Sequence, residues 1–393
     1  MATIAPISGT PNAGIVQPIV TAPMLALAST MVTSMSSFYL LLAAVPAHAD
    51  ALAGHSAAGL ATGILMAATI AGEIVAPRVI RRCGRRSTLA LALIAMALPC
   101  GAAFADTLAL VLLGCAMRGL GLGILLVAAC GLAARLAPEE RRAEALGLYG
   151  LASAIPAIIC VPIGPWALAA VGEQGVAVAA TVAALAALAG VRLLPRDALS
   201  GAPNGKAASL PKLRDAAWPA VTLGIGAVVV GATVTFLPVA HPEIGTNLIA
   251  AGLLLQGLAS AVARWASGRS IDRHGPQSAI VGGVAASIAG AMCLAAPGSF
   301  AVLGGMAISG IGFGVLQGAT LTLLLRRASQ AQTDGASALW NGAYDAGLGV
   351  GGLAVGAVAT STGFATAFIV TGVALATVAF VTFRGIESAR PSC

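Results

Sequence analysis

The chain has 393 residues, of which 58% are hydrophobic and only 9% are charged, and its mean hydropathy is +0.95. Soluble domains carry about a quarter charged residues, so this composition excludes an ordinary soluble enzyme and a disordered or fibrous chain. The formal net charge of +7 comes from basic residues clustered between apolar stretches. That distribution indicates membrane topology and argues against nucleic acid as a partner. The composition therefore predicts an integral membrane protein with the lipid bilayer as its surroundings.

Apolar runs long enough to cross a bilayer follow one another along the chain, at about 20 residues each. They cover residues 18–45, 57–77, 87–105, 107–134, 145–171, 175–194, 217–240, 247–268, 278–296, 300–325, 335–359 and 363–383. The sequence therefore predicts an all-α integral membrane protein with twelve transmembrane helices.

Basic residues follow every second apolar run, whereas the loops between them contain no lysine or arginine. Arg118, inside the fourth run, is the one basic residue of 21 that departs from this alternation. The positive-inside rule then places both termini and the basic loops in the cytoplasm. Arginine outnumbers lysine 19 to 2 and alanine and glycine abound, which favours a bacterial inner membrane protein.

A polar loop at residues 195–216 divides the chain near its middle. Shifting the sequence by 191 positions aligns residues 78–84 with 269–275, where four of seven residues match, and the glycines of 118–123 with those of 309–314. One offset that aligns two separate segments indicates a duplication of six spans. We therefore expect a tail at 1–17, six-helix bundles at 18–194 and 217–383, a cytoplasmic linker at 195–216 and a cytoplasmic tail at 384–393.

The loop after the eighth span contains Gly268, Asp272, Arg273 and Gly275 in the order G-x-x-x-D-R-x-G. This spacing resembles the signature G-x-x-x-D-R-x-G-R-[KR] of the major facilitator superfamily. The loop after the second span is similar over Arg82, Gly84, Arg85 and Arg86, but has Pro77 and Arg81 where the signature has glycine and aspartate.

Arg118 is followed by Gly121 and Gly123, which resembles the span-four signature of the family. The antiporter signature of span five agrees at only two of six positions from Gly147 onward. The resemblance implies two six-helix bundles around a central cavity and transport by alternating access. It also implies that the loop after span two faces the start of span eleven. Because Arg81 replaces the aspartate there, we expect it to pair with Asp334 when the cytoplasmic gate is closed.

Ionisable residues inside the apolar runs are functional candidates, because burying them in a membrane costs several kcal/mol. Four are present: Glu73, Arg118, Arg264 and Asp345. Arg118 and Asp345 lie near the middle of their spans. Arg118 either binds an anionic group or bonds to carbonyls of a neighbouring helix, and Asp345 either carries a proton or joins helices. Glu73 lies near the cytoplasmic boundary, where a gate ion pair is the alternative to proton transfer.

Other polar residues in the spans extend this set of substrate or coupling candidates. They are Thr33 and Ser37 on one face of span one, Gln256, Gln317, Asn341 and Tyr344. Serine and threonine also commonly bond to their own helix, which is the alternative for span one. Gly121, Gly123, Gly312 and Gly314 are expected to pack helices together rather than bind ligands.

These observations predict a secondary transporter that exports small organic molecules in exchange for protons, working as a monomer. An importer or a sugar or metabolite facilitator is the alternative, and low aromatic content argues against sugars. A membrane-embedded enzyme would need a nucleophile with a base or a metal cluster, which the scattered carboxylates and histidines do not supply. No cofactor, metal or catalytic residue is expected.

Overall fold

The computed structural model describes residues 20–136, 142–194, 213–274, 276–327 and 332–387. These segments are helical apart from short connections, with no strand among them. The first half contains α1 (Ala22–Ala53), α2 (His55–Cys83), α3 (Arg85–Ala97), α4 (Leu108–Leu136) and α5 (Arg142–Leu193). The second half contains α7 (Leu213–Ala240), α8 (Gly245–His274), α9 (Pro276–Leu294), α10 (Ser299–Arg327), α11 (Thr333–Thr362) and α12 (Phe364–Glu387).

Three short 3-10 helices complete the described secondary structure: Leu98–Cys100 and Ala102–Phe104 after α3, and Pro242–Ile244 before α8. Among the described residues, ten helices are long and apolar enough to cross a membrane. The apolar part of α12, Phe364–Phe380, is somewhat shorter. The all-α membrane architecture expected from the apolar runs is thus present.

The predicted boundaries differ from the structure in two places. The loop expected after residue 45 is helical as far as Ala53, because Pro46 is accommodated within α1 and the alanine-rich residues after it favour a helix. Two expected spans, 145–171 and 175–194, together form α5. They are separated at Gly172, whose φ of 73° and ψ of 177° interrupt the helix. That positive φ is readily adopted by glycine, so this residue permits the sharp turn.

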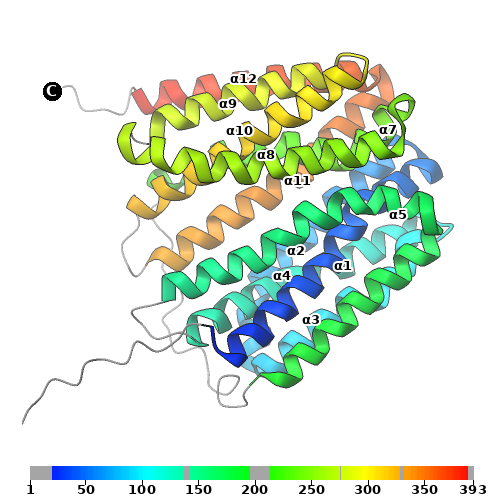
Figure 1. The fold of residues 1–393 in the computed structure, drawn as a ribbon, viewed down its shortest axis with the longest axis vertical. Coiled ribbons are helices and arrows are strands. Elements are labelled where there is room, and N and C mark those ends of the chain that lie inside the picture. The colour runs from blue at the N-terminus through cyan, green and yellow to red at the C-terminus, as the bar shows by residue number, and fades with distance from the viewer. Residues whose placement is uncertain (1–19, 137–141, 195–212, 275, 328–331, 388–393) are drawn as a thin grey trace, which may run out of the picture.

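The expected tail at 1–17 lies outside the described residues, as does most of the linker. Within the linker range, residues 213–216 already belong to α7, and within the C-terminal tail range residues 384–387 belong to α12. Figure 1 shows the helices of the two halves as two layers of roughly aligned rods, with α11 beside the first half.

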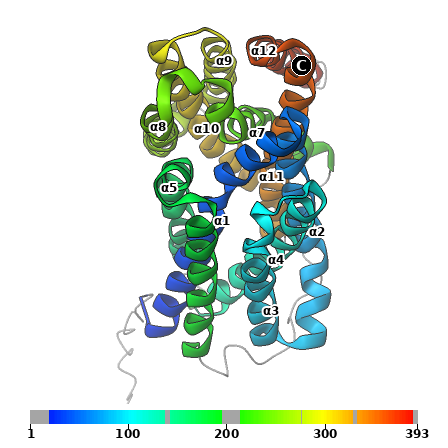
Figure 2. The same cartoon turned by 90° about the vertical axis from the view of Figure 1, so that its right-hand side faces the viewer.

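Packing within each half follows the same scheme. In the first half α1 packs on α5 and α2 on α4, and in the second half α7 packs on α11 and α8 on α10. The halves meet where α11 packs on α2 and where α5 packs on α8, an arrangement visible in the turned view (Figure 2).

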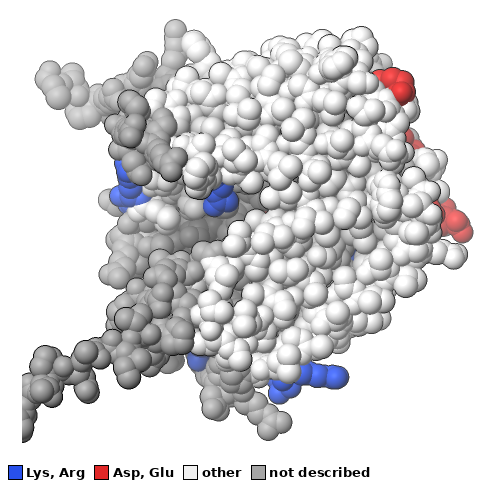
Figure 3. All heavy atoms as spheres, in the orientation of Figure 1, with Lys and Arg blue, Asp and Glu red and all other residues white. Residues whose placement is uncertain are grey.

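The two ends of the molecule carry opposite charge (Figure 3). Of the six acidic side chains that the structure describes, four lie near the connections between helices at one end, here called the acidic end: Asp50, Asp106, Glu173 and Glu243. The opposite end, here called the basic end, carries the described arginines at the helix termini, such as Arg81, Arg135 and Arg326. The two remaining described carboxylates, Glu73 and Asp345, lie within α2 and α11.

Candidate functional site

Asp345 is a buried carboxyl without a partner. It lies on α11 and is 8% exposed, and no described residue donates a hydrogen bond to it or forms an ion pair with it. Glu73, half-buried on α2, likewise has no such partner among the described side chains. An electrostatic interaction links the two carboxyls. Two unpaired carboxyls thus approach each other from different halves of the chain.

All three tyrosines of the chain interact electrostatically with one of these carboxyls. Tyr39 of α1 and Tyr344 of α11 interact electrostatically with Asp345, and Tyr149 of α5 does so with Glu73. The phenol of Tyr149 donates a hydrogen bond to the carbonyl of Leu126 at 3.2 Å. We call these five residues the carboxyl–tyrosine cluster: Tyr39, Glu73, Tyr149, Tyr344 and Asp345.

Sequence reasoning identified three members of the cluster, namely Glu73, Tyr344 and Asp345, and did not include Tyr39 or Tyr149 among its site residues. The scarcity of tyrosine was the available signal, because a rare residue type inside several spans marks a special environment. The ring of Tyr344 stacks on Phe313 of α10, with centroids 5.5 Å apart and an angle of 27° between the planes. Asn341, one turn earlier on α11, is exposed.

Arg118 forms hydrogen bonds inside the first half. One guanidinium nitrogen donates to the carbonyl of Met96 at 2.8 Å and to the sulfur of Cys100 at 2.6 Å. The other donates to the carbonyl of Ser37 on α1 at 2.9 Å. The residue is 3% exposed. Of the two alternatives for Arg118, the contacts match the bonding of helix carbonyls, which ties α4 to α1 and to the end of α3.

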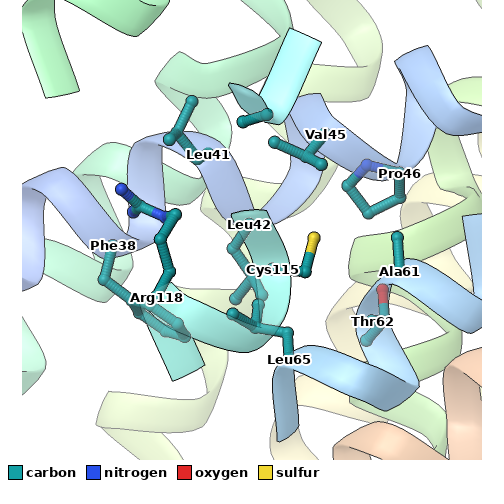
Figure 4. A pocket seen from close by; sticks show the side chains of 11 residues that line it. Phe38, Leu41, Leu42, Val45, Pro46, Ala61, Thr62, Leu65, Cys115 and Arg118 are labelled. Atoms are coloured by element: carbon teal, nitrogen blue, oxygen red, sulfur yellow. The ribbon is translucent and has the colours of Figure 1, made fainter. Parts of the chain in front are cut away.

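A small, mostly apolar cavity lies beside Arg118 and is enclosed by α1, α2 and α4 (Figure 4). Its wall includes Phe38, Leu42, Thr62, Cys115 and Arg118 itself. The cavity lies within the first half, between its own helices, and therefore differs from the central cavity between halves that the family resemblance implies.

The hydroxyls of span one mostly bond to their own helix. Thr33 donates to the carbonyl of Ser29 at 2.8 Å, and Ser36 donates to that of Val32 at 2.7 Å. Ser37 differs, because its buried hydroxyl has no hydrogen-bond partner while its carbonyl accepts from Arg118. Among these hydroxyls, Ser37 remains the one available to a further group.

The two glutamine candidates lie in different surroundings. Gln256 of α8 is 5% exposed, and its amide nitrogen donates to Thr233 of α7 at 3.1 Å and to Ser309 of α10 at 3.0 Å. These bonds join three helices of the second half. Gln317 of α10 accepts a hydrogen bond from the guanidinium of Arg264 at 3.5 Å. Neither glutamine belongs to the carboxyl–tyrosine cluster.

The glycines named as packing residues all face neighbouring backbone. A methyl group on Gly121 would lie 2.7 Å from the carbonyl oxygen of Ala92, and one on Gly312 would lie 2.7 Å from that of Gly283. Gly123 and Gly314 meet the carbonyls of Thr69 and Ser260 more closely still. In each contact of the second half, the glycine and the residue it meets both lie 191 positions after their counterparts in the first half. The offset found in the sequence therefore also relates contacts in space.

The arginine-rich motif after α2 divides into exposed and buried residues. Arg81, Arg82 and Gly84 are exposed. Arg85 is 6% exposed and donates to the carbonyl of Ala128 on α4 at 3.1 Å, while its Nε has no partner. The side chains of Asp272, Arg273 and Asp334, the surroundings of Gly268, and Gly275 lie outside the described residues, so the expected pair of Arg81 with Asp334 stays a prediction.

Comparison with solved structures shows transporters of the same fold. The nucleoside transporter NupG aligns with a TM-score of 0.73 at 13% identity, covering 93% of this chain and 99% of that one. A bacterial homologue of the human lysosomal transporter Spinster, in an inward-facing and unoccupied conformation, aligns with a TM-score of 0.71 at 15% identity, covering 96% and 99%. A POT family transporter in complex with 5-aminolevulinic acid gives 0.74 at 12% identity, covering 92% and 95%.

No curated protein sequence matches the chain. The profile of the Major Facilitator Superfamily matches residues 26–333 and 257–392, which together span nearly the whole sequence and overlap as expected for a duplicated chain. The chain therefore belongs to the Major Facilitator Superfamily.

Proposed function

We propose that this transporter exports small organic molecules in exchange for protons, by alternating access. The observation that carries the proposal is the unpartnered carboxyl of Asp345, which is 8% exposed. A carboxyl in a membrane interior is costly, and burial favours its protonated, uncharged form. When solvent or a substrate cation reaches it, the charged form is stabilised. Such a group binds and releases a proton as its surroundings change.

The arrangement of the two halves supports alternating access. The hydroxyls of Thr62 and Thr235 share a hydrogen bond at 2.9 Å, and those of Ser56 and Thr360 share one at 2.8 Å. Both contacts join the halves in the part of the molecule nearer the acidic end. A hollow separates the halves at the basic end (Figure 3). This is the arrangement expected of a transporter closed at one face and open at the other.

We infer that the basic end faces the cytoplasm, since positively charged loops are retained on that side of a membrane. The four acidic side chains at the opposite end support the same orientation. Counting the two arms of α5 on either side of Gly172 and including α12 gives twelve spans, with both termini cytoplasmic. The chain is then an inward-open, monomeric transporter of a bacterial inner membrane.

The carboxyl–tyrosine cluster favours substrates with a cationic group. No described arginine or lysine pairs with Asp345 or Glu73. Tyrosine rings attract cations through their faces, by about 0.5–1 kcal/mol at exposed sites and more where water is excluded. An apolar molecule with an amine would therefore satisfy a group that the protein leaves unpaired.

The function is tested by efflux from bacteria that lack their own pumps. Cells with and without the protein are loaded with ethidium, a nucleoside or a dipeptide, and loss of each compound is followed with and without a protonophore. We expect protein-dependent loss of ethidium that the protonophore abolishes. Protein-dependent uptake would indicate the importer alternative, and efflux that persists with the protonophore would contradict proton coupling.

A further inference from the structure

Arg264 and Glu73 occupy equivalent positions in the two halves but carry opposite charges. Arg264 lies ten residues before His274, the last residue of α8, and Glu73 lies ten residues before Cys83, the last residue of α2. At a rise of about 1.5 Å per residue, each lies about 15 Å along its helix from the basic end. A cation of the second half and an anion of the first half therefore lie at matching positions inside the membrane spans.

The side of α8 that bears Arg264 faces the first half of the molecule. Gly257 lies seven residues earlier, on the same side of the helix, and a methyl group on it would lie 3.5 Å from the Cα of Ile158 on α5. The halves are thus in contact at Gly257. Arg264 is exposed and lies two turns closer to the basic end, where a hollow separates the halves (Figure 3). This position places Arg264 at the wall of that hollow.

Arg264 has one hydrogen-bond partner among the described residues. Its Nη1 donates to Oε1 of Gln317 on α10 at 3.5 Å, which is long for a hydrogen bond. No described carboxylate forms an ion pair with Arg264 or interacts with it electrostatically. The amide nitrogen of Gln317 has no hydrogen-bond partner in the described part of the chain either. A guanidinium and an amide nitrogen, both hydrogen-bond donors, are therefore available together.

Gln317 also links this pair to the carboxyl–tyrosine cluster. It lies one turn after Phe313 on α10, and the ring of Phe313 stacks on that of Tyr344 with centroids 5.5 Å apart. Residues four apart lie on the same face of a helix. No electrostatic interaction joins Arg264 directly to either carboxyl of the cluster. The opposite charges thus lie on connected walls without neutralising each other, so one small molecule can contact both.

We propose that Arg264 and Gln317, here called the acid-binding site, bind an anionic group of the substrate, so that the preferred substrates are amphoteric. Such a molecule carries a carboxylate at one end and a cationic amine at the other. This assignment rests on the proposed function and narrows its substrate class. A planar guanidinium binds a carboxylate through two parallel hydrogen bonds. Cations without an acidic group still bind to the cluster, but about ten-fold less tightly.

The substrate class is tested with a matched pair of fluorescent dyes, a rhodamine with a free carboxylate and its methyl ester. Both dyes carry the same cationic ring system, and only the first carries an anion. Binding to the purified protein in lipid nanodiscs is measured by fluorescence polarisation, with empty nanodiscs as the blank. We expect the wild type to bind the free acid about ten-fold more tightly than the ester.

Arg264→Gln should remove this preference by weakening binding of the free acid alone, and Arg264→Lys should keep part of it because the charge remains. Arg192→Gln is the matched control, since it removes an exposed arginine at the end of α5, and it should keep the full preference. Equal affinity of the wild type for the two dyes would overturn the acid-binding site. A preference that persists in Arg264→Gln, or an equal loss of both dyes in that variant, would do the same.

Asp345→Asn distinguishes the acid-binding site from the proposed function. This variant should bind both dyes more weakly, because it alters the site of the cation that they share. Unchanged binding of the ester by Asp345→Asn would count against the role of the cluster in the proposed function, whereas a missing preference in the wild type would overturn the acid-binding site alone. Because no pH gradient is applied, neither result depends on the efflux assay.

Discussion

The side chain of Arg118 is bonded to the backbone of Ser37, because its guanidinium donates a hydrogen bond to the Ser37 carbonyl at 2.9 Å. The arginine thereby fixes the backbone of α1 at Ser37, whose own hydroxyl is buried and has no hydrogen-bond partner. A second bond to the carbonyl of Met96 extends this connection to α3. A fixed charge at the middle of a span serves here to connect three helices of one half.

Arg118→Lys should lower the thermal stability of the detergent-solubilised protein. The planar guanidinium reaches both carbonyls at once, whereas a lysine ammonium has a different reach and donor geometry and is expected to leave one unpaired. A buried carbonyl without a partner costs about 1–3 kcal/mol. Arg82→Lys, at the exposed end of α2, is the control and should leave the melting temperature unchanged. Equal melting temperatures for both variants would show that the two hydrogen bonds contribute little.

Gly314→Ala should weaken packing between α10 and α8, because the added methyl group would collide with the carbonyl of Ser260. Gly304→Ala on the same helix meets no atom within 4 Å and should be neutral or slightly stabilising, since alanine favours helix over glycine by about 1 kcal/mol. Thermal melting of the two variants in detergent distinguishes these cases. A Gly314→Ala protein as stable as Gly304→Ala would mean that the helices separate at no cost.

Arg81→Asp should destabilise the state that is closed at the cytoplasmic face, and adding Asp334→Arg should restore it. The reason is the expected attraction between Arg81 and Asp334 across that gate. An exposed ion pair contributes at most about 1 kcal/mol, which changes the ratio of closed to open states several-fold. Spin-label distances across the basic end of the single and double variants provide the measurement. Additive effects of the two substitutions would rule out a direct pair.

Much of the fold follows from local sequence. The apolar runs locate the helices, and the offset of 191 residues relates Gly121 to Gly312, whose contacts the structure repeats in both halves. The position of the turn at Gly172 within α5 was harder to predict from the sequence, because the apolar pattern continues across the turn and only the backbone φ marks it. The predicted end of the first helix, near Pro46, was too early, because a proline inside a long membrane helix need not end it.

The site was only partly predictable. Asp345 and Glu73 stand out in sequence because each is a charge in an apolar run. Tyr149 does not, since it joins the cluster only when α5 packs against α1 and α4 and so comes within electrostatic reach of Glu73. The pair of His48 with Glu173 spans 125 residues and likewise depends on the packing of α1 against α5. Partners of this kind are set by tertiary structure, and a single sequence carries no direct signal for them.

The carboxyl of Asp345 is the centre of the proposed mechanism, and Asp345→Asn replaces it with an amide of the same size that does not gain or lose a proton. The variant should therefore lose transport of ethidium against a gradient while retaining exchange of ethidium between equal pools. Ser267→Ala, which removes a hydroxyl that bonds within α8, is the control and should behave as the wild type.

The most direct measurement follows protons and ethidium together in proteoliposomes that contain a pH-sensitive dye. With the wild type, we predict that ethidium movement in one direction drives proton movement in the other, and that Asp345→Asn abolishes the pH change while ethidium exchange continues. Proton movement that is undiminished in Asp345→Asn, or ethidium transport by the wild type without any pH change, would contradict the account.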